Sequence, residues 1–253
     1  YKDAAKAMKP ASEIDNDLTN ALIEHKLEEH DMLKKVKRKV VKYGQHINLG
    51  CFRVEFIRTN HSIQDAAALA IYSPAGIVLH TGDFKVDYTP VFGDAIDLQR
   101  FGEIGKKGVL ALLCDSTNAE RPGFTDSEKS VGKTLDNIFS EHKNTRIIIA
   151  TFASNVDRVQ QIINAAYKNN KKVVVEGRSM VNVITTAAEL GYIQIPDNTL
   201  IDIEQLGNYP PESTVLITTG SQGESMAALS RMAQNLHRKV HIMPGDTVIF
   251  SSN

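Results

Sequence analysis

The sequence has few of the features that mark secreted or membrane proteins. Its 253 residues include no tryptophan and only two cysteines, Cys51 and Cys114, which are too few and too far apart for a disulfide framework. We therefore expect both cysteines to be reduced thiols in the core of a cytoplasmic protein. There is neither a signal-peptide pattern nor an apolar run long enough to span a bilayer, so no membrane partner is predicted.

Net charge and common nucleotide-binding motifs are also lacking. The formal net charge is −1, so any nucleic acid would be held by a local basic patch rather than by the whole molecule. The sequence contains neither a Walker A motif nor a Gly-x-Gly-x-x-Gly fingerprint, which argues against the usual ATP and dinucleotide sites. The length allows one large domain or two.

A predicted β-hairpin with polar residues at its strand ends organises the N-terminal half. Residues 51–59 alternate in polarity, the stretches 66–73 and 76–81 are apolar, and turn residues separate the last two. His61 and Asp83 therefore follow two strand ends, where an imidazole and a carboxylate can reach one metal ion. A capped turn or an exposed hydrogen bond is the commoner explanation of such a pair, because a zinc site needs three or four ligands.

A basic run lies upstream of this hairpin. Residues 34–42 contain six Lys or Arg side chains interleaved with valines, a pattern that predicts a strand with one cationic face. Exposure to solvent explains such a face, and contact with an RNA backbone is the alternative. Helix-spaced leucines predict a helix over 17–33, whereas residues 1–16 suggest no function.

The C-terminal half alternates short apolar strands with helices from residue 109 onward. This alternation predicts a mostly parallel, doubly wound α/β sheet with helices on both faces. The predicted strands are 109–114, 146–151, 172–176, 199–203, 214–218 and 240–243, and the predicted helices are 127–139, 156–167, 180–190 and 226–236.

Polar residues follow four of these strands, where ligands gather in such sheets. Hydroxyl and amide side chains, glycine N–H groups and helix N-termini suit a phosphate, and an arginine can bind one through two donors. We call the polar residues that follow a strand its tip. Helix N-capping explains the polar residues of any single tip, but several tips that converge favour a phosphate site. The predicted RNA- or phosphate-binding residues are Phe152, Ser154, Asn155, Arg178, Ser179, Ser221 and Gln222.

Several motifs occur in an order that points to one family. They are Thr59-Asn60-His61-Ser62, His80-Thr81-Gly82-Asp83-Phe84-Lys85, Asp115-Ser116-Thr117-Asn118, Thr151-Phe152-Ala153-Ser154-Asn155, Gly177-Arg178-Ser179-Met180, Thr219-Gly220-Ser221-Gln222-Gly223-Glu224 and Pro244-Gly245-Asp246. From about Lys26 to its end the chain resembles ribonuclease J, a nuclease family of the β-CASP branch of the metallo-β-lactamase superfamily. The resemblance implies a partial metallo-β-lactamase αββα layer in residues 1–108, with 1–16 unmatched, and a β-CASP domain in 109–253.

The resemblance also implies site residues and chemistry. His61 matches a zinc ligand, Asp83 a catalytic aspartate that bridges two metal ions, and Asp115 an acidic residue that supports the catalytic centre. Ser154 and Asn155 match positions near bound RNA. Two Zn²⁺ ions per intact site would lower the pKa of a shared water, whose hydroxide attacks phosphorus.

The function expected from the resemblance is zinc-dependent RNA hydrolysis. We expect a 5′-to-3′ exonuclease with endonuclease activity in cytoplasmic RNA decay and maturation. It would prefer 5′-monophosphorylated RNA and form a homo-oligomer when intact.

The sequence departs from the family in its ligand set. The family's His-x-His-x-Asp-His cluster is missing, and the chain ends before the family's last zinc-binding histidine. We therefore expect an internal portion of such an enzyme, with weak zinc binding and little or no nuclease activity of its own. An RNA-binding module without catalysis and a DNA-processing β-CASP nuclease are the alternatives.

Overall fold

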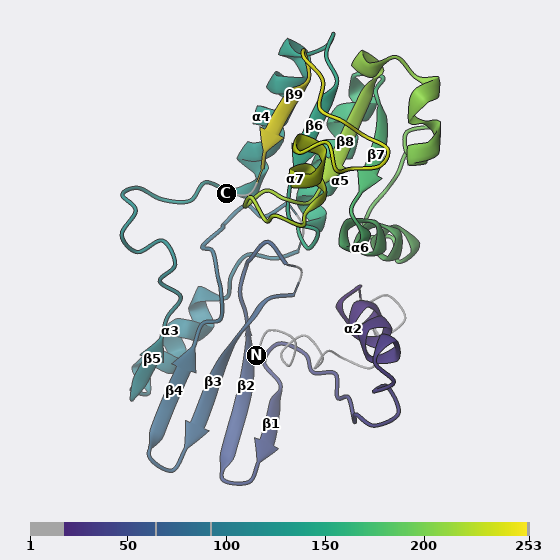
Figure 1. Cartoon of the computed structure of the whole chain (residues 1–253). Coiled ribbons are helices and arrows are strands. Elements are labelled where there is room, and N and C mark those ends of the chain that lie inside the picture. The colour runs from purple at the N-terminus through teal and green to yellow at the C-terminus, as the bar shows by residue number, and fades with distance from the viewer. Residues whose placement is uncertain (1–17, 64, 92, 252–253) are drawn as a thin grey trace. The chain divides into compact units, whose positions relative to one another are not determined.

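The chain divides into two compact units, which are described separately. The computed structural model describes residues 18–63, 65–91 and 93–251, and the units are Tyr1–Ser127 and Glu128–Asn253 (Figure 1). The predicted domain boundary lies earlier, at 108/109. The strand that follows residue 109 pairs within the first unit, which is why the division by contacts falls later.

The first unit contains a five-stranded sheet in the order β1-β2-β3-β4-β5. Strands β1 to β4 are antiparallel, whereas β5 runs parallel to β4. The elements are α2 (Leu18–Glu29), β1 (His46–Leu49), β2 (Phe52–Arg58), β3 (Ala67–Ser73), β4 (Gly76–His80), α3 (Leu98–Lys106) and β5 (Ala111–Leu113). The predicted hairpin is thus confirmed as β3 and β4.

Helix α3 covers one face of this sheet. The Asp97 side chain caps the helix by accepting a hydrogen bond from the Arg100 amide, which satisfies one of the unpaired N–H groups of the first turn. Ile104 of α3 is fully buried in a cluster with Ile57 and Leu79 from the sheet. Because side chains alternate across a strand, the other face has a separate apolar cluster, which includes Val41, Ile47, Val54 and Phe56.

The second unit is built on a four-stranded parallel sheet in the order β7-β8-β6-β9. The predicted mostly parallel α/β unit is therefore confirmed. Its elements are α4 (Glu128–Glu141), β6 (Ile147–Ala150), α5 (Val156–Lys168), β7 (Lys172–Glu176), α6 (Arg178–Glu189), η2 (Ile203–Asn208), η3 (Pro211–Ser213), β8 (Thr214–Thr218), α7 (Ala228–Ala233) and β9 (Thr247–Phe250).

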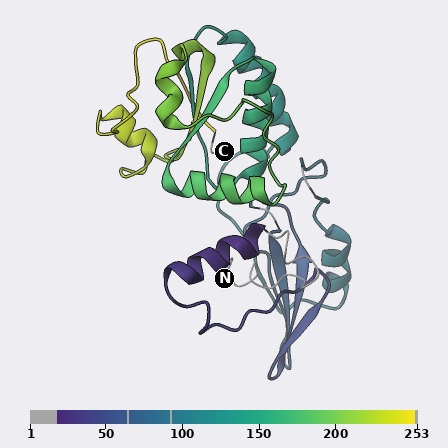
Figure 2. The same ribbon diagram turned by 90° about the vertical axis from the view of Figure 1, so that its right-hand side faces the viewer.

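Helices cover both faces of the second sheet. Figures 1 and 2 show α4 and α5 on one face and α7 on the other. Leu229 and Met232 of α7 pack in one cluster with Ile148 of β6 and Leu216 of β8. Every residue of β6 and β8 is buried, as expected for parallel strands with helices on both faces.

Some predicted strands are wrong. Residues 34–42 form no strand, because the valines do not share a face: Val41 is buried and Val36 is 40% exposed. Residues 199–203 make one isolated bridge, between Leu200 and Val173, before η2 begins. Residues 240–243 are irregular, and β9 lies after them instead.

The predicted burial of both cysteines is also wrong. Cys51 and Cys114 are free and exposed. Cys51 follows the end of β1 in the turn that leads to β2, and Cys114 follows β5, which pairs with β4 at one edge of the described sheet. The turn therefore explains the exposure of Cys51, and the edge position of β5 explains that of Cys114. Among the described residues, no helix is long and apolar enough to cross a membrane.

Candidate functional site

Two predicted metal ligands lie side by side in the first unit. His61 follows the end of β2 and Asp83 follows the end of β4, and these strands flank β3 in the sheet. The Nε2 atom of His61 lies 3.9 Å from Oδ2 of Asp83, and the two side chains are 26% and 47% exposed. The polar tips of the hairpin region thus place an imidazole and a carboxylate together at the rim of the sheet.

Asp115 joins the same end of the sheet through Thr81. The Asp115 amide donates to Thr81 Oγ1 over 2.9 Å, so the tips that follow β4 and β5 are tied together. The pKa of the Asp115 carboxyl lies below its ordinary value, chiefly because the Thr117 hydroxyl and amide donate to it. The backbone N–H of Phe84 and the charge of His61 act in the same direction. Asp115 is therefore held as a carboxylate at the same end of the sheet as the pair.

These donors do not complete a zinc site. Zinc in proteins takes four ligands, of which at least three are usually side chains. Among the described residues, no group of three His, Cys, Asp or Glu side chains is placed to hold one metal ion. His61 and Asp83 therefore fit part of a metal site, and no catalytic step through a metal follows from this chain alone.

The second unit brings its polar tips to one edge. All four strands are parallel, so their carboxyl ends point the same way. The tips after β7 and β8 are in contact: a Cβ on Gly177 would lie 3.0 Å from Oγ1 of Thr219. Gly177 also has φ of +109°, which disfavours any other residue. The missing side chain of Gly177 thus lets the backbone after β7 lie against Thr219 after β8.

Two of the polar residues after β6 have structural roles. Asn155 is 5% exposed and caps α5, with Oδ1 accepting from the Arg158 amide over 3.0 Å. Thr151 is buried, and its hydroxyl donates to the Ser251 carbonyl over 2.9 Å. N-capping thus accounts for Asn155. The neighbouring Ser154 is half-buried, and its hydroxyl makes no hydrogen bond within the described ranges.

The start of α6 has exposed polar side chains. Arg178 and Ser179 occupy the first turn of the helix and are both exposed, and the N-cap residue, Gly177, has no side chain with which to cap it. Helix N-termini attract anions, and an arginine can bind a phosphate through two N–H groups. Gln222 on the neighbouring tip is exposed, while Phe152 and Ser221 are half-buried.

A buried arginine at this edge was not predicted from the sequence. Arg158 is 4% exposed; its Nε donates to Oε1 of Glu128 over 2.5 Å and one terminal nitrogen donates to the Ser251 hydroxyl over 2.6 Å. These three residues are far apart in the sequence, so no local signal links them. The guanidinium fixes the chain where it leaves β9.

Comparison with known proteins identifies the family. Residues 144–253 match the family described as ribonuclease J, beta-CASP domain. The chain is 48% identical over 237 residues to ribonuclease J of Synechocystis and 47% identical over 236 residues to ribonuclease J 1 of Streptococcus pyogenes, in each case across 93% of the chain. The chain belongs to the ribonuclease J family. It spans 37% and 42% of the length of these two relatives.

Ribonuclease J of Helicobacter pylori is also similar, at 44% identity over 93% of this chain and 34% of its own length. A solved structure of a protein of unknown function from Enterococcus faecalis matches 79% of this chain and 51% of its own, with a TM-score of 0.53 and 17% identity. The latter likeness concerns the fold alone.

The motif Pro244-Gly245-Asp246, which this chain shares with ribonuclease J, has a structural role. Asp246, from Pro244-Gly245-Asp246, accepts a hydrogen bond from Arg146 Nε over 2.9 Å, and both side chains are almost completely buried. Arg146 also donates to the His241 carbonyl over 2.6 Å. The motif therefore fixes the loop that precedes β9 against the start of β6.

Proposed function

We propose that this chain carries part of the active site of a zinc-dependent ribonuclease. The whole protein would be a 5′-to-3′ exonuclease with endonuclease activity, acting on 5′-monophosphorylated RNA in cytoplasmic RNA decay and maturation, and it would be a homo-oligomer. In this proposal His61 and Asp83 are zinc ligands, Asp83 and Asp115 are catalytic, and the zinc ions supply the activated water.

The convergence of three strand tips carries this proposal. His61 and Asp83 lie 3.9 Å apart, and Asp115 is held as a carboxylate at the same end of the first sheet. Acidic side chains and an imidazole are the donors that a hydrolytic zinc centre uses. The similarity of the chain to ribonucleases J is the reason for proposing RNA hydrolysis as the reaction.

Zinc binding by the chain tests the proposal. Because two donors make an incomplete site, calorimetric titration should show weak zinc binding that Asp83→Ala and His61→Ala abolish. Asp94→Ala is the matched control, because Asp94 is an exposed carboxylate of the same unit that pairs with Arg58 instead. Zinc binding that persists in both ligand variants would contradict the assignment.

The nuclease assay gives a second readout. The chain alone should leave 5′-monophosphorylated RNA uncut or almost uncut, since the ligand set is incomplete. Rapid turnover by the chain, lost in Asp83→Ala, would show that two donors suffice and would overturn the prediction of inactivity.

The second unit supports a non-catalytic alternative. Arg178 and Ser179 are exposed at a helix N-terminus whose N-cap residue is the glycine Gly177, which suits a phosphate without any metal. An RNA-binding module of this kind would bind with steep salt dependence and leave RNA intact. A competition assay between RNA and DNA of the same sequence distinguishes the hypotheses. Preference for RNA fits the RNA-binding module and the ribonuclease, whereas preference for DNA fits a DNA-processing β-CASP enzyme.

A further inference from the structure

The basic segment, residues 34–42, is an exposed surface in the first unit with one sign of charge. Its lysines Lys34, Lys35, Lys37, Lys39 and Lys42 are all exposed. Within the described ranges none of them forms an ion pair, whereas Arg38 pairs with Glu24. The segment contains no acidic residue. Its positive charge is therefore available to an external anion.

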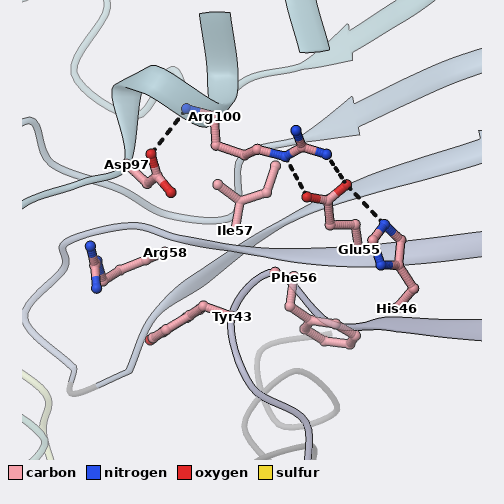
Figure 3. A pocket seen from close by; sticks show the side chains of 9 residues that line it. Tyr43, His46, Glu55, Phe56, Ile57, Arg58, Asp97 and Arg100 are labelled. Carbon is pink, nitrogen blue, oxygen red and sulfur yellow. Dashed lines mark hydrogen bonds and ion pairs between the residues drawn. The ribbon is translucent and has the colours of Figure 1, made fainter. Parts of the chain in front are cut away.

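The basic segment leads directly into an aromatic side chain at a pocket. A turn over residues 42–45 is closed by the Gln45 amide, which donates to the Lys42 carbonyl over 3.0 Å. Tyr43, in this turn, is 37% exposed and lines a pocket of about 400 Å³ (Figure 3). The Arg58 guanidinium lies 6.0 Å from the centre of the Tyr43 ring at the same end of the pocket.

The opposite end of the pocket carries a buried carboxylate, that of Glu55, whose charge is paired with an arginine. Glu55 is 1% exposed, and both its oxygens accept hydrogen bonds from Arg100, with distances of 2.5 and 2.9 Å. His46 lies 3.3 Å from the same carboxylate. Ile57 lies between the two ends but is only 1% exposed (Figure 3), and the Asp97 carboxylate, which accepts a hydrogen bond from the Arg100 amide, also lines the pocket. A flat, uncharged ring stacked on Tyr43 would therefore meet two carboxylates that both already accept hydrogen bonds from Arg100.

We propose that residues 34–43 form a second contact for single-stranded RNA, outside the strand-tip sites of both sheets. The lysines of the basic segment contact successive phosphates, and one base stacks on Tyr43 at the mouth of the pocket. This combination of a cationic track and an aromatic platform is how proteins hold single strands without reading their sequence. The inference rests on the proposed function, because it takes RNA as the ligand.

Binding of a 3′-labelled single-stranded RNA, followed by fluorescence anisotropy at several salt concentrations, tests the phosphate contacts. Replacement of Lys35, Lys37 and Lys39 together by Ala should make the slope of log affinity against log salt shallower by about 2, since each phosphate contact contributes about 0.7. The matched control replaces Lys106, Lys133 and Lys143 by Ala. These are also exposed lysines without an ion pair in the described part of the chain, and the slope should stay unchanged.

Variants of Tyr43 test the stacking. Tyr43→Ala should weaken RNA binding by about 5-fold to 100-fold, whereas Tyr43→Phe, which keeps the ring, should bind like the unaltered chain. Equal binding by all three proteins would refute the stacking contact. If both lysine triples lowered the slope equally while RNA still bound, the basic segment would have no special role and the proposed function would stand. If the unaltered chain bound no RNA, the inference and the RNA-binding part of the proposed function would both fail.

Discussion

The two sheets of this chain differ in how their strands are buried. In the parallel sheet of the second unit every residue of β6 and β8 is buried, between α7 on one face and α4 and α5 on the other. In the first sheet all three residues of β5 are exposed, including Leu112 at 59% and Leu113 at 50%. Short apolar strands are thus buried in the second sheet, whereas the short apolar strand β5 is exposed in the first.

The difference shows where each unit gains its stability. The second sheet relies on burial of branched side chains in its central strands. The first sheet has smaller apolar clusters on its two faces, and it adds a polar network in which Glu55 joins β2 to Arg100 of α3. Substitutions in the two sheets should therefore lower the free energy of unfolding for different reasons, through lost packing in the second and through lost polar contacts in the first.

The largest contrast is expected between two leucines. Leu216→Ala in β8 should lower the free energy of unfolding of the second unit by about 2–5 kcal/mol, because it opens a cavity at a fully buried position. Leu112→Ala in β5 removes the same atoms from an exposed position and should cost about 0.5 kcal/mol or less.

Hydrogen exchange in increasing urea measures both effects, since peptides report on each unit separately and the chain has no tryptophan for fluorescence. Equal losses for the two variants would mean that β5 is packed in solution, and the contrast between the sheets would disappear.

Acid should affect the first unit through Glu55. Burial raises the pKa of this carboxyl, but hydrogen bonds from Arg100 and Tyr72 and the charges of Arg100 and His46 together bring it below the ordinary value of 4.5. The stabilisation from ionised Glu55 is therefore complete above pH 4.5 and is lost as the pH falls below 4.5, through the lowered pKa of the folded state.

The variant Glu55→Gln isolates this contribution. At pH 7 it should destabilise the first unit by about 1–3 kcal/mol, since charge-assisted hydrogen bonds are lost. Urea midpoints measured from pH 7 to pH 3 should converge for the variant and the unaltered chain, and peptides of the second unit serve as the internal control. A constant difference at every pH would contradict the role of the ionised carboxylate.

Local patterns were sufficient to predict the central elements. Residues 214–218 and 146–151 read as short apolar strands, and 156–167 as a helix, because each pattern lies within one element and needs no distant partner. The same holds for the placement of His61 and Asp83 after strand ends.

Features that depend on distant partners were not predictable. The edge position of β5 decides the exposure of Cys114, and no pattern within 109–114 indicates how many neighbours the strand has. Likewise, Arg158 binds Glu128 and Ser251, which lie 30 and 93 positions away. The strand β9 contributes only four residues to the sheet and lay beyond the last predicted strand.

The smallest expected effect separates two neighbours in the tip after β6. Asn155→Ala should destabilise the second unit by about 1 kcal/mol, because its side chain caps α5. Ser154→Ala should leave stability within about 0.5 kcal/mol, since the hydroxyl makes no hydrogen bond in the described ranges. If Ser154 contacts RNA, the same change should weaken binding about threefold to tenfold, the cost of one hydrogen bond. Urea melts and anisotropy titrations of both variants measure the two effects together. A loss of stability in Ser154→Ala equal to that in Asn155→Ala would make both of these residues structural and leave Arg178, Ser179 and Gln222 as the exposed candidates for phosphate contact at this edge.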